Sequence, residues 1–229
     1  MAWKTGKFCD AATARIKVTD GTTSADKTPQ AGTDAQRILA DYLNDLKAIH
    51  ATGAGVPETS YYPAVSNLFN AVGKTLKPRV RCVINLGNQG AGIPDGGLFT
   101  ADQFQHQADG SPKAGQRPAR GAIEIKGTKP NARAIALSTQ VTGYLNAYGI
   151  VIVTNLREFL IVERGTDGAL EREAFVLADD EKEFWHGTAA HPQRTATRVG
   201  DRFIEFIERA CLHSAPLTDP KDVAWFLAS

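Results

Sequence analysis

Two apolar runs in the second half of the chain constrain the fold more than any other feature. "GIVIVTN" occupies residues 149–155 and "EFLIVER" occupies residues 158–164. Both are rich in apolar and β-branched residues over a length typical of strands buried within a sheet. The segment Asn155–Arg157 is long enough only for a tight turn. The sequence therefore predicts two neighbouring strands joined by this turn.

Further strands and helices are predicted on either side of these two runs. "RVRCVINL" (79–86) alternates with a period of two, "DGGLFT" (95–100) is its predicted antiparallel partner, and "RGAIEIKG" (120–127) is a third strand. Apolar residues recur at helical spacing from Thr33 or Asp34 to Ile49, from Thr59 to Val72, from Ala132 to Tyr148 and near 201–212. Leu137 belongs to the predicted buried stripe of the third helix. The order predicts an α/β fold with a central mixed β-sheet flanked by helices.

The length of 229 residues suits one sizeable hydrophobic core. We expect residues 1–33 to be irregular, with a short strand near Arg15–Val18, and residues 34–178 to form the core. Within that core, 101–118 is polar and rich in turn residues, so we expect an exposed insertion there. Residues 179–229 are predicted to be helical, and their apolar ending "DVAWFLAS" predicts a further domain downstream.

Composition and short motifs exclude several classes of protein. The three cysteines are far apart without a CxxC pair, and the five histidines form no HExxH, so neither a disulfide framework nor a zinc site is expected. No GxSxG, GxGxxG or phosphate-loop motif occurs. The longest apolar stretch is too short to span a bilayer. We therefore expect no membrane association and a reducing, cytoplasmic setting.

Basic residues are concentrated in two segments although the whole chain is nearly neutral, with 26 basic and 25 acidic residues. No Asp or Glu lies between Thr59 and Pro94, and 113–133 contains the single acid Glu124. These segments can face DNA phosphates, or they can form an ordinary solvated surface. The candidate phosphate contacts are Lys74, Lys77, Arg79, Arg81, Arg120, Lys129 and Arg133.

Asp95, Glu124 and Lys126 form the strongest candidate site. Residues two apart in a strand share one face, so Glu124 and Lys126 are predicted to project together. If the strand that starts at Asp95 lies alongside, its carboxylate reaches the same face. Two carboxylates form the hard-oxygen site that Mg²⁺ completes with water and phosphate oxygens. A neighbouring lysine can orient or help deprotonate a water and offset negative charge at phosphorus.

"IPD" at 93–95 followed by "IEIK" at 123–126 resembles the PD-(D/E)XK nuclease superfamily, whose fold is a restriction-endonuclease-like α/β core. The resemblance implies a metal-dependent endodeoxyribonuclease in which Asp95, Glu124 and the backbone carbonyl of Ile125 bind Mg²⁺, with Mn²⁺ as a substitute. It assigns the attacking water to Lys126. Glu58, which begins "ETSYYPAVSNLF", matches the acid that supports the site in this family and is a further candidate ligand.

"QVTGY" places Gln140 and Tyr144 four residues apart, as in the QxxxY element of RecB-type members of the superfamily. This spacing puts both side chains on one helix face. The resemblance marks Gln140 as an active-site candidate, and a core position suits Tyr144 equally well.

Over a wider stretch than the motif, the sequence is similar to the N-terminal nuclease region of large fused restriction-modification polypeptides that contain an adenine methyltransferase. The similar segments include "VINLGNQGAGIPDGG" and "TNLREFLIVER". This second resemblance implies covalently linked methyltransferase and target-recognition domains and a role in anti-phage defence. Two alternatives stay open. One is a non-catalytic nucleic-acid-binding module with a nuclease-like fold, and the other is an unrelated enzyme that acts on nucleotides or RNA.

Overall fold

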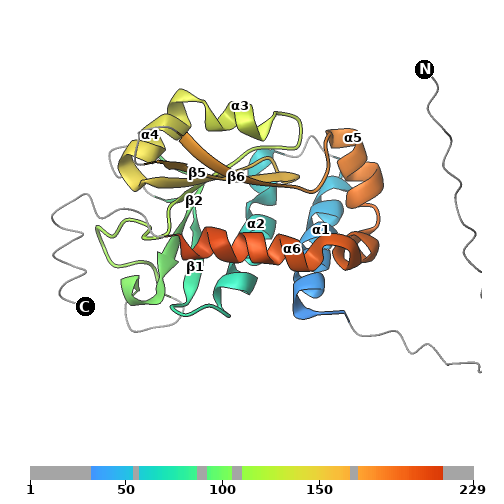
Figure 1. Ribbon diagram of the computed structural model, residues 1–229, viewed down its shortest axis with the longest axis horizontal. Helices are drawn as coiled ribbons and strands as arrows, with labels where there is room; N and C mark the ends of the chain where they lie inside the picture. The colour runs from blue at the N-terminus through green and yellow to red at the C-terminus, as the bar shows by residue number, and fades with distance from the viewer. Residues whose placement is uncertain (1–31, 54–56, 87–91, 105–109, 166–169, 214–229) are drawn as a thin grey trace, which may run out of the picture. The chain divides into compact units, whose positions relative to one another are not determined.

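A six-stranded mixed β-sheet forms the centre of the protein (Figure 1). The computed structural model describes residues 32–53, 57–86, 92–104, 110–165 and 170–213. The strands lie side by side in chain order, and only β3 and β4 are parallel neighbours. They are β1 (Val80–Ile84), β2 (Gly96–Thr100), β3 (Ala122–Ile125), β4 (Ile150–Thr154), β5 (Glu158–Arg164) and β6 (Leu170–Val176).

Helices cover both faces of this sheet, which confirms the predicted fold class. Figure 1 shows α1 (Asp34–His50), α2 (Tyr62–Gly73) and α6 (Pro192–Leu212) on one side of the sheet. On the other side lie α3 (Ala132–Ala136) and α4 (Thr139–Tyr148). Short helical turns complete the described chain: η1 (Glu58–Tyr61), η2 (Ala101–Gln103), α5 (Glu181–Glu183) and the π-turn η3 (Phe184–Thr188).

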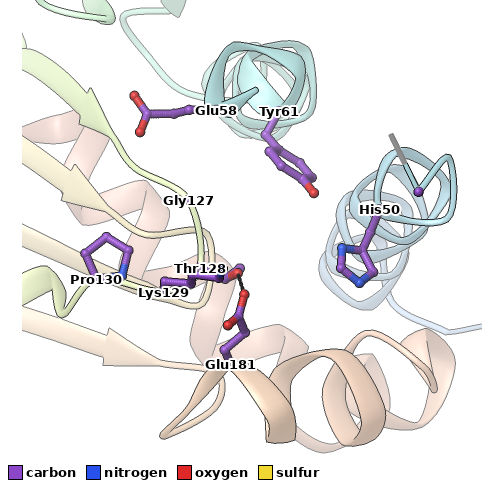
Figure 2. Close-up of a pocket in the computed structure, with 9 residues that line it drawn as sticks. His50, Glu58, Tyr61, Gly127, Thr128, Lys129, Pro130 and Glu181 are labelled. Carbon is purple, nitrogen blue, oxygen red and sulfur yellow. Dashed lines mark hydrogen bonds between the residues drawn. The ribbon is translucent and has the colours of Figure 1, made fainter. Parts of the chain in front are cut away.

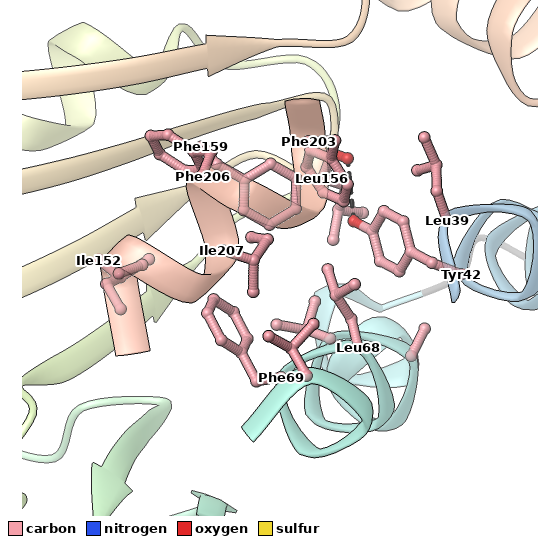
Figure 3. Close-up of a cluster of buried hydrophobic side chains, with 14 of the residues drawn as sticks. Leu39, Tyr42, Leu68, Phe69, Ile152, Leu156, Phe159, Phe203, Phe206 and Ile207 are labelled. Atoms are coloured by element: carbon pink, nitrogen blue, oxygen red, sulfur yellow. Dashed lines mark hydrogen bonds between the residues drawn. The ribbon is translucent and has the colours of Figure 1, made fainter. Parts of the chain in front are cut away.

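The larger hydrophobic core lies between the sheet and α1, α2 and α6. Phe159 of β5, Phe69 of α2 and Phe203 of α6 are buried there (Figure 3). Ile123 and Ile125 also face this core, whereas Ala122 belongs to the smaller core against α3 and α4. The predicted alternation of β3 is therefore confirmed, and it places Glu124 on the side of α4.

Two glycines let β2 lie close to its neighbours. A Cβ atom on Gly97 would lie 2.8 Å from Leu86 Cδ1 and 2.9 Å from Pro118. A Cβ atom on Gly96 would lie 2.9 Å from Ile84 Cδ1. These contacts are too short for a side chain, so the glycines beside Asp95 serve strand packing.

The third predicted helix is interrupted. α3 ends at Ala136, and α4 begins after Ser138, whose hydroxyl accepts a hydrogen bond from the Val141 amide. A serine that caps a new helix end competes with continuation of the preceding helix. Leu137 therefore lies at the break with 62 % of its surface exposed, and its prediction as a buried residue was wrong.

Other boundaries also differ from the predicted ones. β6 was not predicted, and α6 begins at Pro192 rather than near 201. The helical segments between 181 and 188 lie within the stretch 179–229 that was predicted to be helical. In the segment 101–118, Gln103 and Phe104 are buried, so the prediction of an exposed insertion was wrong for these residues. The predictions for Arg15–Val18 and for the last sixteen residues, 214–229, lie outside the described residues.

None of the described helices combines the length and the apolar character that crossing a membrane requires.

Candidate active site

Most of the candidate residues meet at one end of the sheet. Gly96 pairs with Ile123, so Asp95, which precedes β2, lies beside the C-terminal end of β3. Glu124 is in β3, and Lys126 follows it and continues the ladder by donating its amide to Thr154 O at 2.8 Å. The convergence expected from the sequence is therefore present in the structure.

The ammonium group of Lys126 lies where three carboxylates converge. Its Nζ is 2.6 Å from Glu124 Oε1, 3.2 Å from Glu58 Oε1 and 3.9 Å from Asp95 Oδ2. It also donates a hydrogen bond to the Ile125 carbonyl at 3.2 Å. One positive charge thus faces three acidic side chains. With all three ionised, this active-site cluster (Glu58, Asp95, Glu124 and Lys126) attracts a further cation.

Asp95 is held in place through both of its carboxylate oxygens. Tyr62 donates its hydroxyl to Oδ1 at 2.5 Å, and the Ile125 amide donates to Oδ2 at 2.7 Å. Tyr62 is buried, and burial together with the hydrogen bond to Asp95 raises its pKa, so it stays a donor. Sequence reasoning missed this residue. Its spacing of four residues from Glu58 was the available signal.

Glu124 is almost completely buried, with 1 % of its side chain exposed. The pKa of this carboxyl is raised to about 7, mainly by burial; the charges of Asp95 and Glu58 also raise it, and the hydrogen bond to Lys126 and its charge lower it. Gln140 Nε2 lies 3.4 Å from its Oε2. Its buried Oε1 lies 2.6 Å from the ammonium nitrogen of Lys126.

Gln140 and Tyr144 connect α4 to the segment that precedes Asp95. Gln140 Nε2 donates to the Tyr144 hydroxyl at 3.0 Å, and that hydroxyl donates to Ile93 O at 2.8 Å. Tyr144 is buried in the smaller core and burial raises its pKa. It therefore combines a core position with a contact to the site, while Gln140 is largely exposed.

Lys126 is positively charged in this arrangement. Burial lowers its pKa, but the hydrogen bond to Glu124 and the charges of Glu124, Asp95 and Glu58 raise it above the ordinary value for lysine. A protonated amine can donate hydrogen bonds and offset negative charge, but it cannot accept a proton from water.

The donor set fits a magnesium ion. Asp95, Glu124 and the Ile125 carbonyl supply the oxygen ligands that Mg²⁺ prefers. The same three oxygen groups already surround one cation, the Lys126 ammonium. Glu124 Oε1 is buried and is already paired with Lys126 Nζ at 2.6 Å, so a metal ion at this oxygen would share it with the ammonium group. Within the described part of the chain no three His, Cys, Asp or Glu side chains form a metal-binding group. Water and phosphate oxygens would have to complete the coordination, as they do at many magnesium sites.

The basic residues do not all lie near this cluster. Lys129 follows Lys126 closely, and Arg133 lies in the first turn of α3. Lys74, Lys77 and Arg79 precede β1, at the end of the β1–β2 pair opposite Asp95. The length of β1 separates the two ends by about 13 Å. These three lysine and arginine residues therefore cannot contact the phosphate that the cluster would bind.

Two further arginines among the candidate phosphate contacts have internal contacts instead. Arg120 precedes β3 at the end away from the cluster, and its Nη1 donates to Leu212 O at 2.9 Å. The Arg81 guanidinium lies 4.6 Å from the centre of the Phe104 ring. Both contacts link elements of the fold. The sequence-based choice of Arg81 and Arg120 as phosphate contacts did not take these internal contacts into account.

A pocket of about 450 Å³ lies next to the cluster and shares Glu58 with it (Figure 2). Sequence reasoning did not predict it, because its walls come from four separate segments. The lining residues are His50, Gly53, Glu58, Tyr61, Gly127, Thr128, Lys129, Pro130 and Glu181. Thr128 Oγ1 donates a hydrogen bond to Glu181 Oε1 at 2.7 Å, drawn as a dashed line in Figure 2.

Comparisons of the chain with protein-family models, with curated proteins and with solved structures found no match.

Proposed function

We propose that this protein is a Mg²⁺-dependent DNA endonuclease that hydrolyses phosphodiester bonds with a metal-activated water. The supporting observation is the convergence of Glu58, Asp95 and Glu124 on the Lys126 ammonium at one end of the sheet. The order of these residues along the chain, with the resemblance to PD-(D/E)XK nucleases, favours this chemistry over other uses of an acidic cluster.

Asp95, Glu124 and the Ile125 carbonyl would hold the Mg²⁺ ion, or Mn²⁺ in its place, and Glu58 is an additional candidate. When bound, such an ion lowers the pKa of a coordinated water and polarises a phosphate oxygen. Tyr62 and the Ile125 amide keep the Asp95 carboxylate in one orientation for this role. Gln140, on α4, contacts the Glu124 carboxylate through its side-chain amide.

Lys126 would act on the water and on the phosphate. Its ammonium group has three N–H donors, which now face Glu58 and Glu124. If one of these N–H groups turns away from its carboxylate, it can orient the attacking water or a non-bridging phosphate oxygen. Its positive charge offsets the negative charge that builds up as the water oxygen bonds to phosphorus. The attacking water gives up a proton to solvent, the P–O bond to the leaving oxygen breaks, and that oxygen takes up a proton, so the products are a phosphate end and a hydroxyl end.

Lys129 and Arg133 are the basic residues placed to contact DNA phosphates near the cluster. Lys74, Lys77 and Arg79 could reach the DNA backbone only at about 13 Å or more from Asp95, beyond the phosphate bound at the cluster. Such contacts position DNA without reading its bases.

We therefore propose weak, salt-sensitive and non-specific DNA binding by this chain. Target recognition would then belong to linked domains of a restriction-modification or anti-phage enzyme.

A plasmid-nicking assay tests the proposal. Supercoiled plasmid is incubated with the wild type, Asp95→Ala or Lys126→Ala in Mg²⁺, Mn²⁺ or EDTA. We expect nicking by the wild type with either metal, none with EDTA, and a loss of about a hundredfold or more in each variant. Asp41→Ala and Lys182→Ala are matched controls, because both residues are exposed and lie outside the cluster.

The outcomes separate the candidate functions. Nicking that survives Asp95→Ala or Lys126→Ala places the chemistry elsewhere and contradicts the proposal. A wild type that binds DNA but cuts none in either metal favours the alternative, a non-catalytic nucleic-acid-binding module with this fold. Faster cleavage of RNA than of DNA by the same residues would reassign the substrate.

A further inference from the structure

The pocket beside the active-site cluster has the size and the walls of a site for a single planar, polar group. Its volume of about 450 Å³ lies at the lower end of the range for small-molecule sites, so it can admit a nucleobase but not a duplex. Figure 2 shows Tyr61 and His50 pointing into it from two different helical segments. Trp185 stacks on the His50 imidazole with ring centres 3.8 Å apart and 7° between planes, and its indole N–H donates to Thr128 Oγ1 at 3.3 Å.

The pocket continues directly from the cluster. Glu58 belongs to both, and Gly127, Thr128 and Lys129 follow Lys126 in the chain. A DNA strand with a phosphate at Lys126 would therefore bring a neighbouring nucleotide to the pocket mouth. Lys129 is exposed there and can contact the adjoining phosphate.

The polar lining contains two carboxylate acceptors beside Tyr61, Thr128 and Lys129, whose side chains can donate. Glu58 and Glu181 present carboxylates, and the Thr128 hydroxyl already donates to Glu181. Adenine and cytosine present exocyclic amino groups as donors, whereas thymine presents a carbonyl oxygen at the equivalent position. Carboxylates therefore favour an amino-bearing base and repel the thymine carbonyl, while aromatic walls accept the face of any base.

We propose that this pocket binds one unpaired nucleobase of the DNA strand held at the cluster, and that it prefers a base with an exocyclic amino group over thymine. The inference rests on the proposed nuclease function for the position of the strand. It implies that the enzyme acts on single-stranded DNA or draws one nucleotide out of the duplex beside the scissile phosphate.

Fluorescence anisotropy with the full chain tests the preference. The probes are fluorescein-labelled oligothymidines in which one central position is T, C or A, in Ca²⁺ buffer so that a divalent ion offsets the charge of the cluster. We expect a single C or A to tighten binding by about fivefold to tenfold. Glu181→Ala should remove this difference, whereas the matched control Glu205→Ala, an exposed acid on α6, should keep it.

A second variant covers the case in which Glu181→Ala fails to fold. His50 is exposed, so His50→Ala spares the core and should weaken binding of all three probes by removing a stacking surface. Equal affinity for the three probes in the wild type, or unchanged affinity in His50→Ala, overturns the pocket proposal. Plasmid nicking by the same preparations distinguishes the two proposals. A base preference without nicking contradicts only the proposed nuclease activity. Nicking without a base preference contradicts only the proposed base-binding pocket.

Discussion

At the scale of single residues, the orientation of Asp95 depends on Tyr62, a residue with no charge and no place in the sequence motif. The phenol donates to one carboxylate oxygen while the Ile125 amide donates to the other. A metal ligand whose rotamer is fixed in this way loses no conformational freedom on binding.

Tyr62→Phe should weaken metal binding by about tenfold, since loss of an orienting partner commonly costs ten- to a hundredfold in affinity. Titration of Mn²⁺ followed by electron paramagnetic resonance measures this without DNA or turnover. Tyr148→Phe is the matched control, because Tyr148 is buried and its hydroxyl has no hydrogen-bond partner among the described residues. Equal Mn²⁺ affinities of Tyr62→Phe and Tyr148→Phe would show that Tyr62 does not contribute to metal binding.

Glu124 makes stability depend on pH. Its folded-state pKa of about 7 lies above the ordinary value of 4.5, so the folded protein holds this proton more tightly than the unfolded chain. The associated stability is fully present below pH 4.5 and is lost as the pH rises through 7. The full effect corresponds to about 3 kcal/mol.

Glu124→Gln should therefore gain stability relative to the wild type as the pH rises. We expect the difference in unfolding free energy between variant and wild type to increase by about 2–3 kcal/mol from pH 5 to pH 8 in EDTA. Urea denaturation at both pH values measures it, with the exposed Glu205→Gln as control. Parallel pH profiles for Glu124→Gln and the wild type would contradict the raised pKa of the buried Glu124 carboxyl.

At the scale of elements, helix boundaries depended on caps more than on apolar spacing. Thr33 caps α1 as expected, with its hydroxyl accepting from the Gln36 amide. The same apolar spacing extended the third predicted helix across Ser138, where the structure has a break. Periodicity shows which face is apolar, but a capping side chain decides where the helix starts.

Ser138→Ala should destabilise the protein by about 1 kcal/mol, because the Val141 amide loses the hydroxyl that accepts its hydrogen bond. The midpoint of urea unfolding is the measurement. Thr139→Ala is a suitable control, since Thr139 is an exposed neighbour at the start of the same helix. A Ser138→Ala variant as stable as the control would show that this cap contributes nothing.

At the scale of the whole molecule, α6 packs in the larger core, on the face of the sheet opposite α3 and α4 (Figure 1). Phe203 is fully buried and contacts the rings of Tyr42, Phe159 and Phe175, which come from a helix and two strands. The tyrosine hydroxyl in turn donates to Leu156 O at 2.9 Å, in the turn between β4 and β5.

Phe203→Ala should lower the unfolding free energy by about 3–5 kcal/mol, the usual effect of a large cavity in an aromatic core. Chemical denaturation gives the value directly. Leu212→Ala on the same helix is the control, because Leu212 is 45 % exposed and should cost little. A small effect of Phe203→Ala would mean that the core collapses around the missing ring.

The sequence by itself determined the class of fold and the face on which Glu124 lies, because both depend on side-chain alternation between chain neighbours. It also indicated Asp95, Glu124 and Lys126, since each lies in or next to a predicted strand, whereas Glu58 entered through the resemblance to PD-(D/E)XK nucleases. Only the tertiary structure decided that Tyr62 holds Asp95, that Lys126 lies among three carboxylates, and that a pocket opens beside them. It also decided that Lys74 and Arg79 lie away from the site. These features depend on contacts between segments far apart in the chain, and local periodicity carries no information about such distances.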